Sequence, residues 1–148
     1  MKHDVIAIRP VTRDDYELIL AWWGIPEIRK FTSTLKQPSF AELADQFRQP
    51  GRRDFMIIHE RRRIGRTCLI DHQQYEELSL YVGELALHGR GIGTAAICLT
   101  AKRASKPLRA RVMKSNIASM KAFVANGFTV LSEDDVAVWL TQVSGARA

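Results

Sequence analysis

The sequence predicts a single α/β domain, residues 1–148, in which helices cover the faces of a mixed β-sheet. Segments with the two-residue alternation of strands are interleaved with segments of helical periodicity, in the order β-α-α-β-β-β-α-β-α-β-β. The composition, 46% hydrophobic and 26% charged residues, is that of a soluble globular protein, and 148 residues are enough to bury a core. We find no internal repeat, low-complexity tract or linker in the sequence.

The first part of the chain predicts one strand and two helices. Residues 4–10 are rich in β-branched side chains and end in a proline, which predicts a short strand. Thr12 is suited to cap a first helix, which runs to about Trp23 before a glycine and a proline interrupt it. Residues 38–51 contain a second helix with Ser39 as its cap.

Three strands then form an antiparallel meander. Residues 54–60 and 63–72 are strand-like, and the arginine-rich stretch between them is typical of a solvated hairpin turn. Residues 75–84 alternate between apolar and polar side chains, which predicts the third strand.

The second half of the chain alternates helices and strands. Residues 93–105 form a strongly apolar segment that predicts a helix. Asn116 is suited to cap another helix, whose end is marked by an Asn-Gly pair. The remaining expected elements are strands at residues 106–113, 128–131 and 136–143.

Composition argues against several classes of protein. No stretch approaches the roughly 20 apolar residues of a transmembrane helix, and the N-terminus carries Asp4 and no long apolar region. We therefore expect a cytoplasmic protein with no signal peptide. Cys68 and Cys98 lie far apart in apolar runs without metal-ligand spacing, so we expect two buried, reduced thiols and no metal. The net charge of +6 suits either nucleic acid or a small molecule with several phosphates.

The stretch from His88 to Thr94 places three glycines where a helix is about to begin. Glycine costs a helix about 1 kcal/mol relative to alanine, so we expect a bare backbone whose N–H groups hold an anion at the helix N-terminus. A Walker loop is disfavoured because no lysine follows the glycines. A dinucleotide fold is disfavoured because the preceding strands form an antiparallel meander.

This glycine stretch closely resembles the pyrophosphate-binding motif of the GNAT acetyltransferases, Gln/Arg-x-x-Gly-x-Gly/Ala. The resemblance extends over nearly the whole chain. Residues 8–20 resemble the opening strand and first helix of the family, and residues 78–84 resemble its central strand. Residues 116–128 resemble its last long helix and the Gly-Phe that begins the next strand. The combination of the loop with Asn-x-x-Ser and Asn-Gly-Phe is more specific than the glycines alone.

The resemblance implies a fold, a co-substrate and a set of binding residues. The fold is a mostly antiparallel sheet of six to seven strands flanked by about four helices, with a V-shaped splay between the central strands. The co-substrate is acetyl-CoA. The residues implied to contact it are Leu80, Tyr81, Val82, His88, Gly89, Arg90, Gly91, Ile92, Gly93, Thr94, Asn116, Ser119 and Phe123.

Two positions depart from the family pattern. His88 stands where the motif has Gln or Arg, a change we expect to be tolerated because backbone N–H groups do most of the binding. Phe123 stands where the family often has a tyrosine that protonates the departing thiolate, and a phenylalanine has no proton to donate. That role is therefore vacant or filled by another residue.

The resemblance also suggests candidates for chemistry and for acceptor binding. Ser119 is the candidate to protonate the thiolate, against the alternative of an incidental helix serine. Glu84 and Glu77 are candidates for the general base, although a carboxylate at either position is more often a surface charge. The residues expected on the acceptor side are Trp22, Trp23 and Arg29. At least one of the two indoles is expected in the core, and a solvated charge is the simpler interpretation of Arg29.

The resulting hypothesis is an N-acetyltransferase that moves an acetyl group directly to a primary amine in a ternary complex. A small-molecule acceptor, such as an amino sugar or an aminoglycoside, is slightly favoured. The alternatives are an enzyme that acetylates protein N-termini or aminoacyl-tRNA, and a CoA-binding module without turnover. We expect a monomer or homodimer that binds neither a membrane nor, most simply, nucleic acid.

Overall fold

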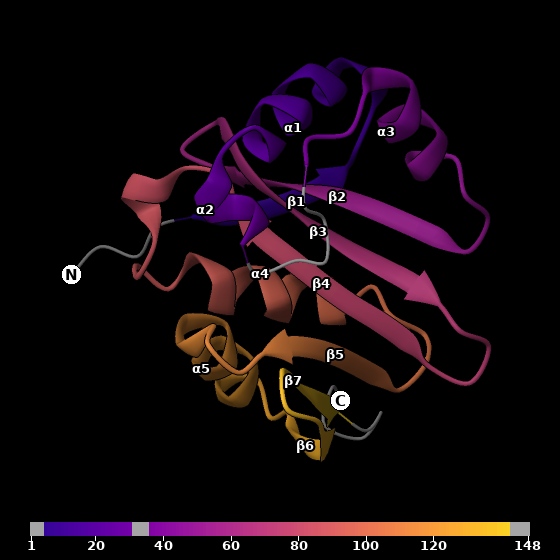
Figure 1. Ribbon diagram of the computed structural model, residues 1–148, viewed down its shortest axis with the longest axis vertical. Helices are drawn as coiled ribbons and strands as arrows, with labels where there is room; N and C mark the ends of the chain where they lie inside the picture. The colour runs from indigo at the N-terminus through magenta and orange to yellow at the C-terminus, as the bar shows by residue number, and fades with distance from the viewer. Residues whose placement is uncertain (1–4, 31–35, 143–148) are drawn as a thin grey trace.

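The computed structural model describes residues 5–30 and 36–142, which form a seven-stranded mixed sheet in the order β1-β2-β3-β4-β5-β7-β6 (Figure 1). The strands are β1 (Ile6–Pro10), β2 (Arg52–His59), β3 (Arg62–Asp71), β4 (Glu76–Val82), β5 (Leu108–Met113), β6 (Thr129–Glu133) and β7 (Ala137–Gln142). The helices are α1 (Tyr16–Trp23), α2 (Pro26–Arg29), α3 (Phe40–Phe47), α4 (Ile92–Ala101) and α5 (Ile117–Ala125), with 3₁₀ turns η1 (Arg13–Asp15) and η2 (Leu85–Leu87).

The order of strands and longer helices agrees with the sequence prediction. The structure differs from the prediction directly after α1, where it contains an additional short helix. The sequence predicts a break at the glycine and proline there, whereas the chain resumes as the short helix α2 with Pro26 in its first turn. Proline lacks an N–H, which the first helical position does not need, and its φ already suits a helix. The outer ends of the first and last expected strands, Asp4 and Val143, lie outside the described residues.

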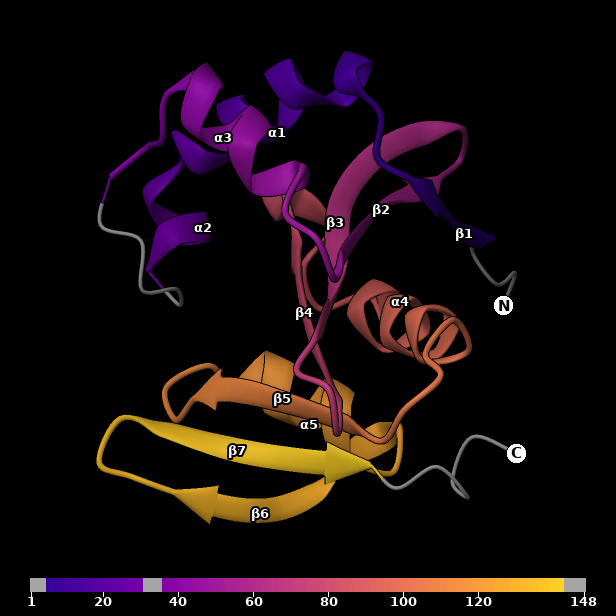
Figure 2. The same cartoon turned by 90° about the vertical axis from the view of Figure 1, so that its right-hand side faces the viewer.

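Helices cover both faces of the sheet. The helix α4 packs on β1, β3 and β4 and also contacts α5, while α3 packs on β2 and against α1. In Figure 2, α4 and the α1–α3 group lie on opposite sides of β4. Across the described residues, no helix has the length and apolar character needed to cross a membrane.

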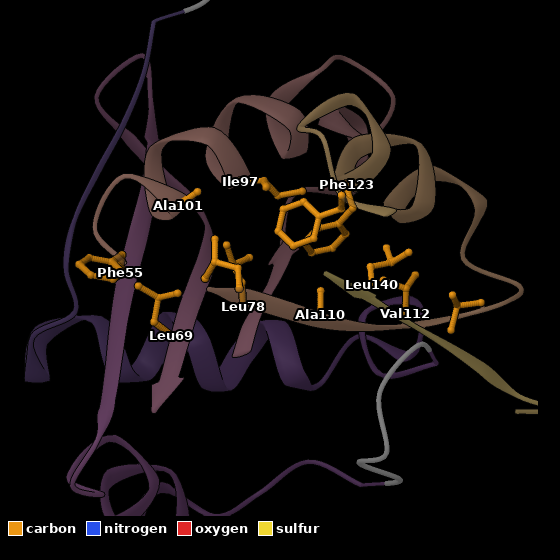
Figure 3. Close-up of a cluster of buried hydrophobic side chains, with 12 residues drawn as sticks. Phe55, Leu69, Leu78, Ile97, Ala101, Ala110, Val112, Phe123 and Leu140 are labelled. Atoms are coloured by element: carbon orange, nitrogen blue, oxygen red, sulfur yellow. The ribbon is translucent and has the colours of Figure 1, made fainter. Parts of the chain in front are cut away.

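The main hydrophobic core lies between the sheet and the helices α4 and α5 (Figure 3). Phe55, Leu78 and Leu140 point into it from three strands, and Ile97 and Phe123 close it from the two helices. Because this core includes residues of β2, β4 and β7, it joins the two halves of the sheet.

The two cysteines differ in burial, which corrects one expectation. Cys68 is buried on β3, and burial raises the pKa of its thiol to about 11. Cys98 is exposed, contrary to the sequence prediction. The buried side of α4 is formed by other positions, Ile92, Ala96, Ile97, Thr100 and Ala101, so an apolar helix sequence alone did not indicate which face Cys98 occupies.

The parallel contact between β4 and β5 is short. Both strands lie wholly within the described residues, and their register contains two pairs, Glu76 with Leu108 and Glu77 with Arg109. Beyond Glu77 the strands diverge, as Figure 2 shows, while β4 stays paired with β3 up to Val82. This divergence confirms the V-shaped splay that the family resemblance implies.

Candidate active site

The open edge of β4 presents backbone groups to the splay. Gly83 donates its N–H to the Ile64 carbonyl of β3 at 2.6 Å. Since hydrogen-bonded and non-hydrogen-bonded pairs alternate in an antiparallel ladder, Val82 and Leu80 turn their N–H and C=O groups away from β3. These groups therefore face the space between β4 and β5. Such an edge can pair with an extended ligand as a strand would.

The glycine loop lies immediately after this edge and opens α4. Gly89 and Gly91 have φ values of +80° and +79°, which glycine adopts without the steric penalty of other residues. A Cβ at either position would have no described atom within 4 Å, so the bare backbone borders open space. Gly91 is the N-cap of α4, and no described side chain caps that helix. The first N–H groups of the helix are therefore suited to bind an anion.

Gly93 has a packing role as well. A Cβ there would lie 3.8 Å from Leu80 Cδ1 and 4.0 Å from Ala122 Cβ, so the first turn of α4 sits close to β4 and α5. Asn126, at the end of α5, donates its side-chain amide to the Thr94 carbonyl at 3.0 Å. This contact holds the N-terminus of α4 beside α5.

The His88 side chain links the loop to the strand. Its Nε2 lies 2.8 Å from the Val82 carbonyl oxygen, one of the groups that face the splay. The sequence prediction gave His88 a backbone role only. The side-chain contact joins residues six apart across the intervening turn η2, and the sequence gives no signal for it.

Aromatic side chains pack around the end of β4 and support it. Trp22 packs directly on Gly83, where an added Cβ would lie 2.3 Å from the indole Cε2. The ring of Tyr81 meets those of Trp22 and Trp23 at centroid distances of 5.9 and 5.3 Å. Burial raises the pKa of the Tyr81 hydroxyl. The two tryptophans, predicted to lie on the acceptor side, are 4% and 8% exposed, so they mainly hold β4 in place.

A buried ion pair lies behind Tyr81, and sequence reasoning did not single it out. Arg66 of β3 pairs with Asp54 of β2 at 2.6 Å, and its guanidinium lies 5.0 Å from the Tyr81 ring centre. Alternate residues of a strand share one face of the sheet, and on its face of β3 Arg66 lies between two apolar residues. This pattern could have indicated a buried charge.

The predicted residues of α5 have different environments. The Asn116 Oδ1 accepts a hydrogen bond from the Ser119 backbone N–H at 3.2 Å, so Asn116 caps the helix as predicted. This cap uses the oxygen and leaves Nδ2 as the donor of that side chain. Ser119 is half-buried. Phe123 is 2% exposed and packs edge-on against Phe128 at 5.0 Å, inside the hydrophobic core.

The two candidate bases lie at opposite ends of β4. Glu77 accepts a hydrogen bond from His72 Nε2 at 3.0 Å, and it lies where β4 and β5 are still paired. Glu84 follows β4 and pairs with Arg62 at 2.7 Å. Seven strand residues correspond to roughly 20 Å, so one reaction centre cannot use both carboxylates.

The predicted arginines lie at two separate places. Arg90 is exposed within the glycine loop, between Gly89 and Gly91. Arg29 is half-buried at the end of α2, where its guanidinium donates to the Trp23 carbonyl. The structure therefore places Arg90 in the glycine loop before α4, whereas Arg29 holds α2 against the end of α1.

Solved structures share this fold. A domain from Methanocaldococcus jannaschii has 25% sequence identity and a TM-score of 0.86, with 95% of this chain and 99% of that chain covered. The spermidine N-acetyltransferase from Vibrio cholerae, solved with CoA and spermine, has 14% identity and a TM-score of 0.85. That similarity covers 96% of this chain and 97% of the Vibrio chain.

Sequence comparison gives the family. An uncharacterized protein from Methanocaldococcus jannaschii is 29% identical over 94% of this chain, and the chain spans 31% of the length of that relative. The family model described as acetyltransferase (GNAT) domain matches residues 6–129, which include the opened strand, the glycine loop and α5. The chain therefore belongs to the GNAT acetyltransferase family.

Proposed function

We propose that this protein transfers the acetyl group of acetyl-CoA directly to a primary amine of a small molecule. The observation that carries the proposal is the adjacency of two backbone surfaces, the open edge of β4 and the uncapped glycine start of α4. One suits an extended amide-bearing arm and the other suits a diphosphate. The CoA in the structure of the Vibrio cholerae relative supports the same co-substrate here.

Backbone amides would bind and activate the thioester. In this proposal Gly91, Ile92 and Gly93 donate N–H groups to the diphosphate, and the net charge of +6 favours a polyanion. Leu80 pairs with the pantetheine arm through its N–H and C=O groups, which face the splay. The Val82 N–H would hydrogen-bond the thioester oxygen and stabilise the negative charge that develops on it as the amine attacks.

Side chains would handle the protons. The attacking amine must be neutral, and it loses a proton as the new C–N bond forms and the C–S bond breaks. Ser119 is our candidate to protonate the departing thiolate, because it is half-buried in the first turn of α5. Glu84 is our candidate to accept the amine proton, since it directly follows the opened part of β4. Glu77 is less favoured because it lies where the strands are still paired.

The acceptor is proposed as a small-molecule amine. The spermine in the structure of the Vibrio cholerae relative supports this class. Amino sugars and aminoglycosides belong to the same class and stay in the proposal. An acceptor on aminoacyl-tRNA would require a binding surface for the phosphate backbone, whose affinity falls steeply with added salt.

Calorimetry with matched glycine variants tests the proposal. We expect wild-type protein to bind CoA, and Gly91→Ala to weaken binding at least tenfold because its Cβ enters the space beside the loop. Gly51→Ala is the control, since Gly51 also has a positive φ, +77°, but lies beside Asp71, near the other end of β4. Both variants carry similar backbone strain, about 1 kcal/mol.

Turnover separates an enzyme from a binding module. We expect thiol release from acetyl-CoA with at least one member of a panel of polyamines, amino sugars and aminoglycosides. Binding of CoA without turnover on the whole panel would contradict the small-molecule acceptor, and absence of heat on titrating CoA into wild-type protein would overturn the proposal entirely.

A further inference from the structure

We propose that the imidazole of His88 is a positioning residue for acetyl transfer, acting through the backbone of Val82. The inference rests on the function proposed above and assigns a role to a side chain. The observation is the contact of 2.8 Å between His88 Nε2 and the Val82 carbonyl oxygen. Because a carbonyl oxygen only accepts, Nε2 carries the proton and donates it.

The contact fixes a peptide group at both of its ends. The peptide unit between Val82 and Gly83 has its carbonyl bound to His88 and its N–H bound to the Ile64 carbonyl at 2.6 Å. Trp22 lies directly on the Gly83 backbone and limits movement out of the sheet. The last residue of β4 is thereby held although β5 gives it no partner.

Holding this peptide unit also orients the Val82 N–H, the amide group proposed to act in the reaction. The N–H and C=O of one strand residue point to the same side of the strand. With its C=O held at the splay by His88, Val82 must direct its own N–H into the splay as well. This is the group proposed above to stabilise the thioester oxygen, and such stabilisation depends on a donor that is already aligned.

His88 is itself held in place by the backbone. Its N–H donates to the Leu85 carbonyl at 3.1 Å, which fixes the residue at the end of the turn η2. Gly89, with φ of +80°, follows at once and begins the open loop. The side chain thus donates to the strand edge from a residue whose own backbone is fixed.

Three substitutions of His88 distinguish a positioning role in the reaction from a general structural role. Glutamine places a side-chain N–H about as far from the backbone as Nε2, whereas asparagine is too short and alanine has no donor. We expect His88→Ala and His88→Asn to lower kcat about tenfold. His88→Gln should retain kcat within about threefold, and all three should keep the Kd for CoA within about threefold, because the diphosphate binds the backbone.

The outcomes distinguish this inference from the proposed function. Wild-type protein that transfers no acetyl group contradicts the proposed function. Active wild-type protein contradicts this inference alone if His88→Ala keeps its kcat, if His88→Gln loses as much as His88→Ala, or if only the Kd for CoA changes. Nitrogen-15 NMR gives a readout independent of activity: we expect a protonated Nε2 in His88, and a neutral ring protonated at Nδ1 would overturn the hydrogen bond.

Discussion

At the scale of single residues, Phe123 and Ser119 show how one helix divides structural and chemical roles. The family resemblance places a proton donor at position 123, but Phe123 lies in the core against Phe128. Ser119 lies one turn earlier and is half-buried, next to the helix cap provided by Asn116. The hydroxyl nearest the start of α5 is therefore the better candidate for contact with a substrate.

We predict opposite effects for two substitutions on α5. Ser119→Ala should lower kcat about tenfold or more, as expected for loss of a positioned proton donor, while leaving the melting temperature nearly unchanged. Phe123→Tyr should leave kcat unchanged and cost roughly 1–3 kcal/mol of stability, because its hydroxyl is buried among apolar side chains. Steady-state kinetics and thermal unfolding of both variants check this, and a gain of activity in Phe123→Tyr would contradict the placement of Phe123.

At the scale of elements, sequence patterns predicted most of the fold and only part of the site. Alternation and capping residues indicated the strands and longer helices because these signals are local. The glycine loop was recognisable for the same reason. The contacts of Trp22 with Gly83 and of Arg66 with Asp54 join residues distant in the chain, and no local pattern encodes them. The burial of Phe123 likewise depends on how α5 packs on the sheet.

The contact between α1 and the end of β4 gives a prediction at this scale. Gly83→Ala should destabilise the fold by about 3 kcal/mol, because a Cβ there would lie 2.3 Å from the Trp22 indole and force the packing to shift. Trp22→Phe in the same chain should recover part of this loss, since a smaller ring leaves space for the methyl group. Denaturant unfolding of the two single variants and the double variant measures the coupling, and strict additivity would mean that the two residues do not share a contact.

At the scale of the whole molecule, buried charge ties the N-terminal elements to the sheet. Asp15 of η1 is fully buried and pairs with Arg9 of β1 at 2.7 Å and with Arg63 of β3 at 3.2 Å. Its Oδ2 also accepts the Thr12 backbone N–H at 2.8 Å. One carboxylate thus connects β1 and η1, which are neighbours in the sequence, to β3, which lies about 50 residues further along the chain.

This carboxylate predicts how stability depends on pH. Burial alone raises the pKa of Asp15, but the hydrogen bonds from its two arginines and a backbone amide outweigh burial and hold that pKa well below the ordinary 3.8. Since the pKa is lower in the folded state, its stabilisation is complete above about pH 4 and is lost as the pH falls further. Asp15→Asn should therefore cost about 2 kcal/mol at neutral pH and flatten the acid limb of the stability curve.

The exposed neighbour Asp14 provides the control for this experiment. Asp14→Asn removes the same formal charge from the same turn but leaves both ion pairs of Asp15, with Arg9 and with Arg63, in place. We expect its unfolding free energy, measured by urea titration between pH 3 and pH 7, to follow that of wild-type protein. Equal acid sensitivity in Asp15→Asn and wild-type protein would show that the buried carboxylate does not set the acid limit.

The two-pair junction of β4 and β5 makes the sheet discontinuous at its middle. A pantetheine arm lying along Leu80 and Val82 would serve as a short eighth strand and fill that gap. Binding of acetyl-CoA would then complete the sheet, as a late folding step does. The free energy of unfolding would rise with the logarithm of the acetyl-CoA concentration, so the protein with acetyl-CoA bound would resist heat better.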